Sequence, residues 1–275
     1  MKPTKPFELL IDADPLLYQS LLASEEEIEW TDNDIWTLVA DLKQAKEIFN
    51  AKVTDLIHLS GCSLYSLCFS DTKNFRKEFA PYYKGNRKGK RKPVGFKAFK
   101  EWAMEEGVSN EAVGRSLLWP NLEADDIIGI LGTEPKPKHP RVIYSIDKDL
   151  DNIAGIHFKI EEKDDDVHVL FLTLTPEESY KNFLTQCLSG DPVDNISGLK
   201  GYGKVKSTKA LEKSPTWRTV VSTYISSGMS EADAVETARL VHILHWDDYN
   251  METGKVRLWN ANHQKIATKD TTLGC

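Results

Sequence analysis

Cysteine is scarce in this 275-residue chain, and its four cysteines are irregularly spaced. None belongs to a Cys-x-x-Cys pair, which argues against a disulfide framework or a zinc cluster and suits a reducing environment. We interpret the thiols as small buried apolar groups or as residues without a special role. They are Cys62, Cys68, Cys187 and Cys275.

Long apolar runs are also missing. The run from Phe7 to Ile11 is too short for the apolar segment of a signal peptide, and no stretch of 18 apolar residues occurs. We therefore expect a cytoplasmic protein that neither spans a membrane nor is exported. With 40% hydrophobic residues, the chain can bury a substantial core.

Acidic residues are absent from one window of an otherwise acidic chain. Between Lys84 and Lys100 there are eight basic residues and no acidic one, so the net charge of −7 leaves −15 on the remainder. This asymmetry indicates a basic arm above an acidic body, although a solvated flexible loop has the same composition. The basic residues are Lys84, Arg87, Lys88, Lys90, Arg91, Lys92, Lys97 and Lys100.

Short apolar runs alternate with stretches of helical periodicity up to about residue 174, and helical patterns dominate from 175 onward. This order predicts an α/β fold with a parallel sheet flanked by helices, followed by a mostly helical part. The expected strands are 7–11, 64–69, 116–119, 142–146, 156–160 and 167–172. The expected helices are 34–51, one opened by Pro93 and continuing through Trp102, 122–131, 176–188, 208–211, 216–225 and 231–245.

Acidic residues follow several of these strands. Ligands of an open parallel sheet bind beyond the carboxyl ends of its strands, so acids at those ends are expected to converge. A single acid there is ordinary turn or helix-capping chemistry, and we exclude Asp164 to Asp166 as a solvated hairpin turn. Three carboxylates within four residues exceed what capping needs, because close like charges repel unless a cation neutralises them. The candidates are Asp12, Asp71, Glu123, Asp125, Asp126, Asp147 and Asp149.

Oxygen ligands without paired histidine or cysteine select hard cations. Mg²⁺ is the natural choice, and Mn²⁺ is a plausible substitute. Two such ions about 4 Å apart can generate hydroxide and stabilise the leaving oxygen in an attack on a phosphodiester. Hydrolysis of nucleic acid is therefore the leading chemistry.

A glycine-rich connection follows the helix expected at 176–188. Gly198, Gly201 and Gly203 allow a tight turn whose amide groups face a phosphate at the next helix N-terminus, and an ordinary helix-helix loop is the alternative. Lys200, Lys204 and Lys206 add positive charge. Asp191 and Asp194, just before the turn, are candidates for outer metal ligands or for helix caps.

Several motifs occur in an order that resembles the flap endonuclease/5′-3′ exonuclease family, from about residue 7 to 212. The segment Arg239 to Asn250 and the run Val256 to Trp259 further resemble the 5′-3′ exonucleases of short-tailed bacteriophages. The motifs are Asp12, Phe69-Ser-Asp71, Phe75-Arg76, Tyr83-Lys-Gly-Asn-Arg87, Leu122-Glu-Ala-Asp-Asp126, Ser145-Ile-Asp-Lys-Asp-Leu150 and Gly190-Asp-Pro-Val-Asp-Asn-Ile-Ser-Gly198.

The resemblance implies a PIN-like nuclease domain over 1–174 with a basic helical arch at about 72–108. It also implies a helical DNA-binding subdomain over 175–275, with a helix-turn-helix-like (H3TH-like) turn at about 188–212. One metal would be held by Asp12, Asp71, Glu123 and Asp125. The second would be held or oriented by Asp126, Asp147, Asp149, Asp191 and Asp194.

The family pattern also gives roles to the arch and the turn. Lys84 and Arg87 would contact the scissile phosphate, and Tyr83 would stack near the 5′ end, since an aromatic face stacks any base. Val205 stands where the family's turn has lysine, so the neighbouring lysines would supply that phosphate contact. The turn of the family can also bind K⁺. Further DNA contacts are expected from Lys88, Lys90, Arg91, Gly201, Gly203, Lys204 and Lys206.

These features predict a structure-dependent 5′ nuclease that hydrolyses DNA at 5′ ends, flaps or nicks. RNA in RNA–DNA hybrids is a second candidate substrate. We expect the protein to be a monomer, and to act in the host cytoplasm if a phage encodes it. A PIN-type ribonuclease would lack the basic arch and the glycine-rich turn. A catalytically silent DNA-binding protein would have no reason to keep so many clustered carboxylates. A Ser/His/Asp hydrolase is disfavoured because no Gly-x-Ser-x-Gly elbow occurs.

Overall fold

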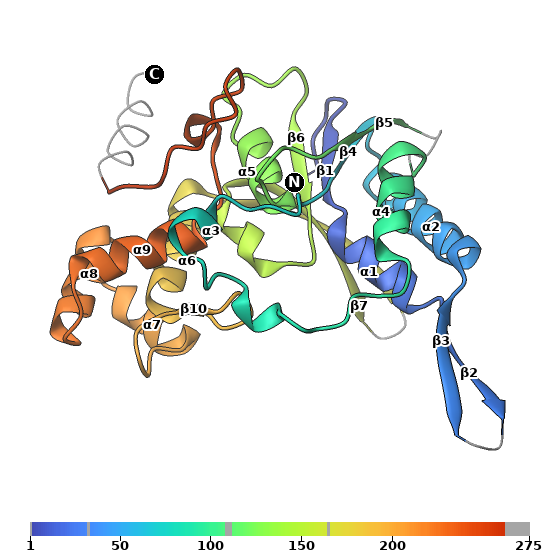
Figure 1. Ribbon diagram of the computed structural model, residues 1–275. Coiled ribbons are helices and arrows are strands. Elements are labelled where there is room, and N and C mark those ends of the chain that lie inside the picture. The colour runs from blue at the N-terminus through green and yellow to red at the C-terminus, as the bar shows by residue number, and fades with distance from the viewer. Residues whose placement is uncertain (1, 32–33, 108–111, 164–165, 262–275) are drawn as a thin grey trace.

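A six-stranded sheet forms the centre of the protein, whose computed structural model describes residues 2–31, 34–107, 112–163 and 166–261 (Figure 1). The strand order is β5-β4-β1-β6-β7-β8, with parallel pairing from β5 to β7 and antiparallel pairing of β8 with β7. The α/β class predicted from the sequence is therefore confirmed. The strands are β1 (Glu8–Asp12), β4 (Leu64–Cys68), β5 (Val113–Leu117), β6 (Arg141–Tyr144), β7 (Gly155–Lys163) and β8 (Asp166–Leu174).

The strand order reverses beside β1. From β1 the chain proceeds to β4 and β5 on one side, and β6 then pairs with the opposite edge of β1. In doubly wound sheets, such a switch point opens a crevice beyond the carboxyl ends of the two strands. The segments that leave β1 and β6 are therefore placed at the rim of one crevice.

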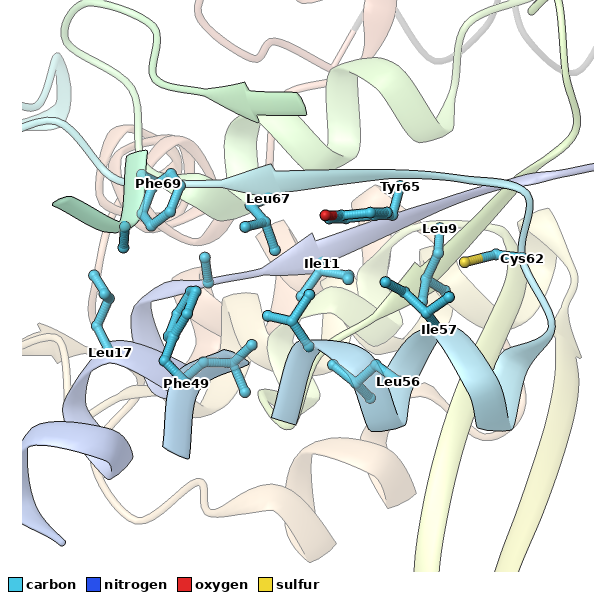
Figure 2. Close-up of a cluster of buried hydrophobic side chains, with 14 of the residues drawn as sticks. Leu9, Ile11, Leu17, Phe49, Leu56, Ile57, Cys62, Tyr65, Leu67 and Phe69 are labelled. Carbon is cyan, nitrogen blue, oxygen red and sulfur yellow. The ribbon is translucent and has the colours of Figure 1, made fainter. Parts of the chain in front are cut away.

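Alternation along β1 divides the core between the two faces of the sheet. Leu9 and Ile11 pack with buried side chains of three helices on one face, as Figure 2 shows for α2, whereas Leu10 packs with α5 on the other. The three helices of the first face are α1 (Asp14–Leu22), α2 (Leu42–Ser60) and α4 (Phe96–Glu105), and α5 spans Ala124–Gly132.

The prediction of one helix over 34–51 was wrong in its first part. Residues Ile35–Ala40 form β3, which pairs antiparallel with β2 (Glu25–Thr31) in a hairpin that projects from the body (Figure 1). The β-branched and aromatic residues of this segment favour a strand. Helix α2 begins only after Asp41, whose carboxylate accepts hydrogen bonds from the amides of Lys43 and Gln44.

The helical part packs around its own apolar cluster, to which Ala80 and Tyr83 also belong. Capping boxes begin two of its helices, at Thr175 with Glu178 and at Ser230 with Asp233. The last helix ends at Val241, four residues earlier than predicted. The helices are α6 (Pro176–Ser189), α7 (Lys204–Leu211), α8 (Trp217–Ser226) and α9 (Glu231–Val241), and the short strands β9 (Gly190–Asp191) and β10 (Ile196–Ser197) lie between α6 and α7.

The basic segment links the helical part to the helices beside the sheet (Figure 1). It starts at α3 (Arg76–Phe79) and reaches α4, as predicted for the helix after Pro93. Between residues 80 and 95, all of which the structure describes, the only helical turn is the 3-10 turn η1 (Gly85–Arg87). The span from Ala80 to Gly95 is thus a strap made mostly of turns between α3 and α4.

Two further 3-10 turns, η2 (Lys148–Asn152) and η3 (Trp246–Asp248), complete the helical elements of the described residues. Cys62, Cys68 and Cys187 are buried free thiols, as expected. Cys275, Asp164 and Asp165 lie outside the described residues. In the described part of the chain, every helix is too short or too polar to cross a bilayer.

Candidate active site

Asp12 ends β1 at the switch point and is 6% exposed. One of its carboxylate oxygens accepts a hydrogen bond from Ser145 Oγ at 3.1 Å, immediately after β6. Burial, together with Asp14, raises the pKa of Asp12 to about 7, and Asp147 adds to this effect. The two strand ends thus bring their acids together, as the sequence predicted.

Asp125, in the first turn of α5, faces the same group. Burial raises its pKa well above the ordinary value, with further contributions from Asp12, Asp147 and Glu123. Its Oδ1 atom is buried and has no hydrogen-bond partner among the described residues. A buried carboxylate oxygen without a partner is costly unless a cation approaches it, so this atom fits a metal ligand.

Asp14 belongs to this group, although the sequence analysis did not select it. Its carboxylate accepts a hydrogen bond from the amide of Ser70 at 3.3 Å, and its own amide donates to Asp12. Burial raises the pKa of Asp14, while Ser70 and Lys100 lower it. Lys100 also donates to the carbonyl of Ser70, which ties α4 to this site. The sequence signal for Asp14 was its position two residues after Asp12. It was overlooked because an acid in the first turn of a helix is also explained by the helix dipole.

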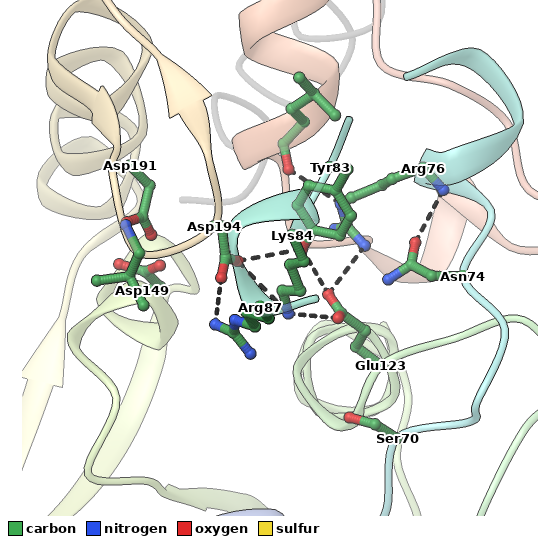
Figure 3. Close-up of polar contacts among 12 residues, drawn as sticks. Ser70, Asn74, Arg76, Tyr83, Lys84, Arg87, Glu123, Asp149, Asp191 and Asp194 are labelled. Carbon is green, nitrogen blue, oxygen red and sulfur yellow. Dashed lines mark hydrogen bonds and ion pairs between the residues drawn. The ribbon is translucent and has the colours of Figure 1, made fainter. Parts of the chain in front are cut away.

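Glu123, the N-cap of α5, receives the cation of the strap (Figure 3). Lys84 Nζ donates to one of its oxygens, and the Tyr83 hydroxyl donates to the other at 2.7 Å. Burial alone would raise the pKa of Glu123, but Lys84 and Arg76 outweigh it and hold the pKa at about 2. Lys84, expected at the scissile phosphate, and Glu123, expected at a metal, are therefore in direct contact with each other.

A second group of carboxylates comes from the turn after α6 and from η2. Asp194 accepts from Tyr83 at 3.1 Å and pairs with Arg87, and Lys84 Nζ lies 3.4 Å away. Burial, Asp147 and a hydrogen bond with Asp191 together raise the pKa of Asp149 to about 7. Members of both groups line one cavity, namely Glu123, Asp125, Asp149, Asp191 and Asp194.

The turn that presents Asp191 and Asp194 needs glycine at both ends. A Cβ on Gly190 would lie 2.2 Å from the Gly198 amide nitrogen, and one on Gly198 would lie 2.2 Å from the Ser189 carbonyl carbon. No side chain fits between such closely spaced backbones. The spacing of this motif thus follows from the close pairing of β9 with β10.

The strap is fixed to this turn at its base. Asn195 Nδ2 donates to the Tyr82 carbonyl at 2.8 Å, and Asn86 Nδ2 donates to the Pro192 carbonyl at 3.0 Å. The amide of Lys84 donates to the Asp194 carbonyl at 2.8 Å. These bonds hold Lys84 in place, although its φ of 54° is uncommon for a residue other than glycine.

Asp126 differs from its predicted role as a metal ligand. It is fully buried, and Arg76 binds its two oxygens at 2.7 and 2.8 Å. The amides of Glu123 and Leu244 also donate to it, each at 3.3 Å. With both oxygens engaged, Asp126 is a structural partner of Arg76, and we withdraw it from the ligand set.

Asp71 and Tyr83 also differ from their predicted roles. The Asp71 carboxylate accepts from the amides of Thr72 at 2.6 Å and Asn121 at 2.8 Å; these bonds outweigh burial and lower its pKa. It therefore stabilises a turn, and Asp14 lies nearer the other acids. Tyr83 is 3% exposed and packs in the helical cluster. Its ring is not available for stacking on a base, and its hydroxyl orients Glu123 and Asp194.

The remaining cations of the strap fall into two kinds. Lys88 and Lys90 are exposed, as a phosphate contact requires. Arg91 instead binds Glu25 of β2 through two bonds of 2.6 and 2.8 Å, and the same carboxylate accepts from the Val94 amide. Arg91 thus anchors the strap to the hairpin, which differs from its predicted role in DNA binding.

The predicted glycine-rich turn lies at the N-terminus of α7. Gly201 has a φ of 78° and Gly203 is the N-cap, and a Cβ at either position would meet open space. Lys206 Nζ lies 3.9 Å from the Tyr202 ring centroid, and Lys204 is exposed. Val205 is 85% exposed, so this apolar side chain points to solvent where a contact with a ligand is possible.

The raised pKa values predict how stability depends on pH. Asp12 and Asp149, with pKa values of about 7, keep protons that the unfolded chain releases near its ordinary value of 3.8. The free energy of unfolding should therefore fall as pH rises from about 4 to 7. The low pKa of Glu123 acts in the opposite direction but only as pH falls from 4.5 toward 2.

We expect the Tm in EDTA to decrease between pH 5 and pH 8, and excess Mg²⁺ to reduce this decrease by neutralising the carboxylates. Differential scanning fluorimetry at matched ionic strength measures both. The variant Asp149→Asn should show a shallower decrease in EDTA than the unchanged chain. A Tm that rises over this range would contradict the assigned protonation.

Comparison with solved structures shows which known proteins share this fold. No family model matches the chain. Among solved structures, the T5 D15 protein co-crystallised with metal ions superposes with a TM-score of 0.61 at 16% identity, over 86% of this chain and 89% of that one. T5 5′-exonuclease with bound zinc ions gives a TM-score of 0.58 at 16% identity, over 86% and 89%. The fold is thus that of the T5 5′-exonuclease.

Sequence comparison identifies nearer relatives. The exonuclease of Escherichia phage T7 is 28% identical over 289 aligned positions, which cover 91% of this chain and 92% of that protein. The exodeoxyribonuclease of Enterobacteria phage T3 matches with the same identity and coverage. The resemblance to phage 5′-3′ exonucleases noted from the motifs is confirmed, and it extends over nearly the whole chain.

Proposed function

We propose that this protein is a structure-dependent 5′ nuclease, a 5′-3′ exonuclease or flap endonuclease that hydrolyses DNA phosphodiester bonds at 5′ ends. One observation carries the proposal: carboxylates from three segments line a single cavity, and Lys84 and Arg87 of the basic strap pair with two of them, Glu123 and Asp194. Acids that bind cations, beside cations that bind phosphate, suit phosphoryl transfer. The end-to-end similarity to two phage exonucleases supports the same activity.

The residues present fit a pair of Mg²⁺ ions, with Mn²⁺ as a substitute. Their donors are oxygen atoms, one of them buried without a partner, and burial and neighbouring acids raise the pKa values of several. When bound, such ions activate water and stabilise the leaving oxygen. We assign one ion to Asp12, Asp125 and Glu123, with Asp14 beside them. We assign the other to Asp147, Asp149, Asp191 and Asp194.

Lys84 and Arg87 bring positive charge to the place where the scissile phosphate would lie. Burial would lower the pKa of Lys84, but Glu123 and Asp194 outweigh it and raise the pKa, so the ammonium group stays charged. A charged group held in a buried site stabilises developing negative charge more strongly than one in water. Tyr83 positions Glu123 and Asp194 rather than the substrate.

Replacing Lys84 with methionine should lower the single-turnover cleavage rate by about 10² to 10³-fold, because a preorganised charge at the reacting phosphate is removed. The Kd for DNA should change far less. Rapid-quench kinetics at saturating enzyme separates the two effects. If affinity falls and the rate at saturation does not, Lys84 is a phosphate contact and not part of the chemical step.

The proposed site also suggests how the chain is divided into domains. We assign 1–174 to the nuclease domain with its arch and 175–275 to a DNA-binding subdomain. Within the subdomain, Gly201, Gly203 and the lysines at 204 and 206 would contact the backbone of duplex DNA through amides and charge. A K⁺ ion bound by the carbonyls of this turn is part of the same proposal.

The exposed cations of the strap should determine part of the salt dependence of DNA binding. Each phosphate that a lysine neutralises contributes about 0.9 to the slope of log K against log salt concentration. Lys88→Met should therefore reduce the slope by about one. Arg91→Met should reduce it less, because Glu25 already neutralises Arg91. Fluorescence anisotropy at several salt concentrations measures both slopes, and equal losses would contradict the distinction.

The deciding experiment incubates the protein with a 5′-labelled flap duplex and a 3′-labelled nicked duplex, each with Mg²⁺ and with EDTA. Release of mononucleotides or short oligomers only with Mg²⁺ would support the proposal, and product length separates exonuclease from flap cleavage. Binding without cleavage would favour a silent DNA-binding protein.

Two RNA substrates test the remaining alternatives. A matched RNA–DNA hybrid tests cleavage of RNA in hybrids, and a free RNA tests the PIN-type ribonuclease alternative. We expect a monomer acting in the cytoplasm, or in the host cytoplasm if a phage encodes it.

A further inference from the structure

Two histidines and an aspartate gather where the chain leaves α9, outside the carboxylate cavity. His242 is the C-cap of α9 and has an extended backbone, and η3 follows His245 and contains Asp248. The side chains of His242 and Asp248 are only 7% and 9% exposed. None of these three residues has a role in the nuclease chemistry proposed above.

The donor atoms of these three side chains all lie within 4.8 Å of one another. His242 Nε2 lies 2.8 Å from Asp248 Oδ2, and the two imidazole rings are 5.2 Å apart and nearly perpendicular. The three groups therefore surround one small volume. Among the described residues, no other three histidine, cysteine or acidic side chains have their donor atoms this close to one another.

We propose that His242, His245 and Asp248 form a separate metal site for a zinc-class divalent cation. Imidazole nitrogen suits Zn²⁺ and similar transition metals, in contrast to the all-oxygen cavity, and two histidines with one carboxylate are an established zinc ligand set. Bonds of about 2.0 to 2.2 Å to a tetrahedral ion place ligands about 3.3 Å apart. His242 and Asp248 already lie this close, and the donor atom of His245 would have to approach them to complete the set.

The surroundings of the site are compatible with a cation. The ring of His245 accepts a hydrogen bond from the Asp248 amide in the capping box that begins η3, so one of its nitrogens carries a lone pair that a metal would take instead. Arg257 lies 3.8 Å from the other oxygen of Asp248 and is about half exposed, so solvent screens its charge. Water would supply a fourth ligand, as in other three-ligand zinc sites.

The proposed site lies next to the buried ion pair of Arg76 and Asp126, so an ion bound there would affect the structure around this pair. The carbonyl of His242 accepts a hydrogen bond from Arg76 at 2.7 Å, and the amide of Leu244 donates to Asp126. Asp126 lies in α5 beside Asp125 and Glu123. An ion on this segment would therefore stiffen the frame that holds the first turn of α5, without entering the carboxylate cavity.

The primary test is NMR of the side-chain nitrogens of ¹⁵N-histidine-labelled protein in excess Mg²⁺, which occupies the carboxylates, during titration with Zn²⁺. We expect the ring nitrogens of His242 and His245 to shift together and saturate at one equivalent, while those of the exposed His168 do not. Unchanged rings of His242 and His245 would overturn the proposal. The three side chains would then serve only as a helix cap and a histidine–aspartate pair.

A second measurement uses matched variants. At a hundredfold excess over its Kd, Zn²⁺ should raise the Tm by about 5 °C or more. His245→Asn should lose this rise, whereas His168→Asn should keep it, and any Zn²⁺ that enters the carboxylate cavity affects both variants alike. An equal rise in the two variants would count against the site. If His245→Asn does not fold, the NMR titration of the unchanged chain still decides.

Discussion

Cleavage by the Asp125→Asn variant should be at least about 10³-fold slower than by the unchanged chain, while the metal-free protein becomes no less stable. The rate falls because a buried ligand for the cation loses its charge. Stability is maintained or increased because burial and three neighbouring acids oppose the charge of Asp125 in the absence of metal. Active sites commonly combine such a local cost in stability with function.

Three measurements together test this prediction. Mg²⁺-dependent cleavage gives the rate, anisotropy in Ca²⁺ or EDTA gives DNA affinity, and urea unfolding in EDTA gives stability. Asp55→Asn, an exposed acid on α2, is the matched control and should leave all three unchanged. Turnover in Mg²⁺ that survives the Asp125 change would show that the site is assigned to the wrong residues.

Replacing Arg76 with methionine should lower the free energy of unfolding by about 3 to 5 kcal/mol, the typical effect of breaking a buried ion pair on one side. Asp126 would be left fully buried without its cation, and the carbonyls of Leu240 and His242 would lose a donor. Methionine keeps most of the apolar stem, which limits the loss of packing. Because whole domains are stable by about 5 to 15 kcal/mol, a change of this size is readily measured.

Urea unfolding monitored by circular dichroism checks this expectation. Lys43→Met removes an exposed ion pair with Glu47 on α2 and should cost less than about 0.5 kcal/mol. The double variant Arg76→Met/Asp126→Asn should lose less than the sum of its single changes, because the two residues interact directly. A small effect of Arg76→Met, similar to that of Lys43→Met, would contradict the structural role of the buried pair.

Sequence patterns predicted the sheet and much of the acidic site because both depend on local order. A short buried strand that ends on an acid, as at Asp12, places that acid at the rim of a parallel sheet whatever the distant partners are. The hairpin of β2 and β3 was missed because Glu25–Glu29 alternates weakly in polarity and its partner strand mimics a helical period. Only cross-strand pairing distinguishes the two.

The residues whose roles in the structure differ from the predicted ones have partners that lie far away in the sequence. Arg76 and Asp126 are 50 positions apart, and Arg91 and Glu25 are 66 apart. A motif shows that such side chains are present, but only the fold shows which charges are already neutralised. Asp14 was overlooked for the converse reason, because its local setting at a helix start explains an acid without any function.

The two anchors of the strap limit what can pass beneath it. Arg87 is fixed to Asp194 of the turn between α6 and α7, and Arg91 is fixed to Glu25 of the projecting hairpin. Four peptide steps separate these arginines, and an extended chain covers at most about 14 Å in four steps. The free part of the strap is therefore a short bridge between two fixed supports. While both supports hold, the distance between the two arginines' backbones cannot exceed this length.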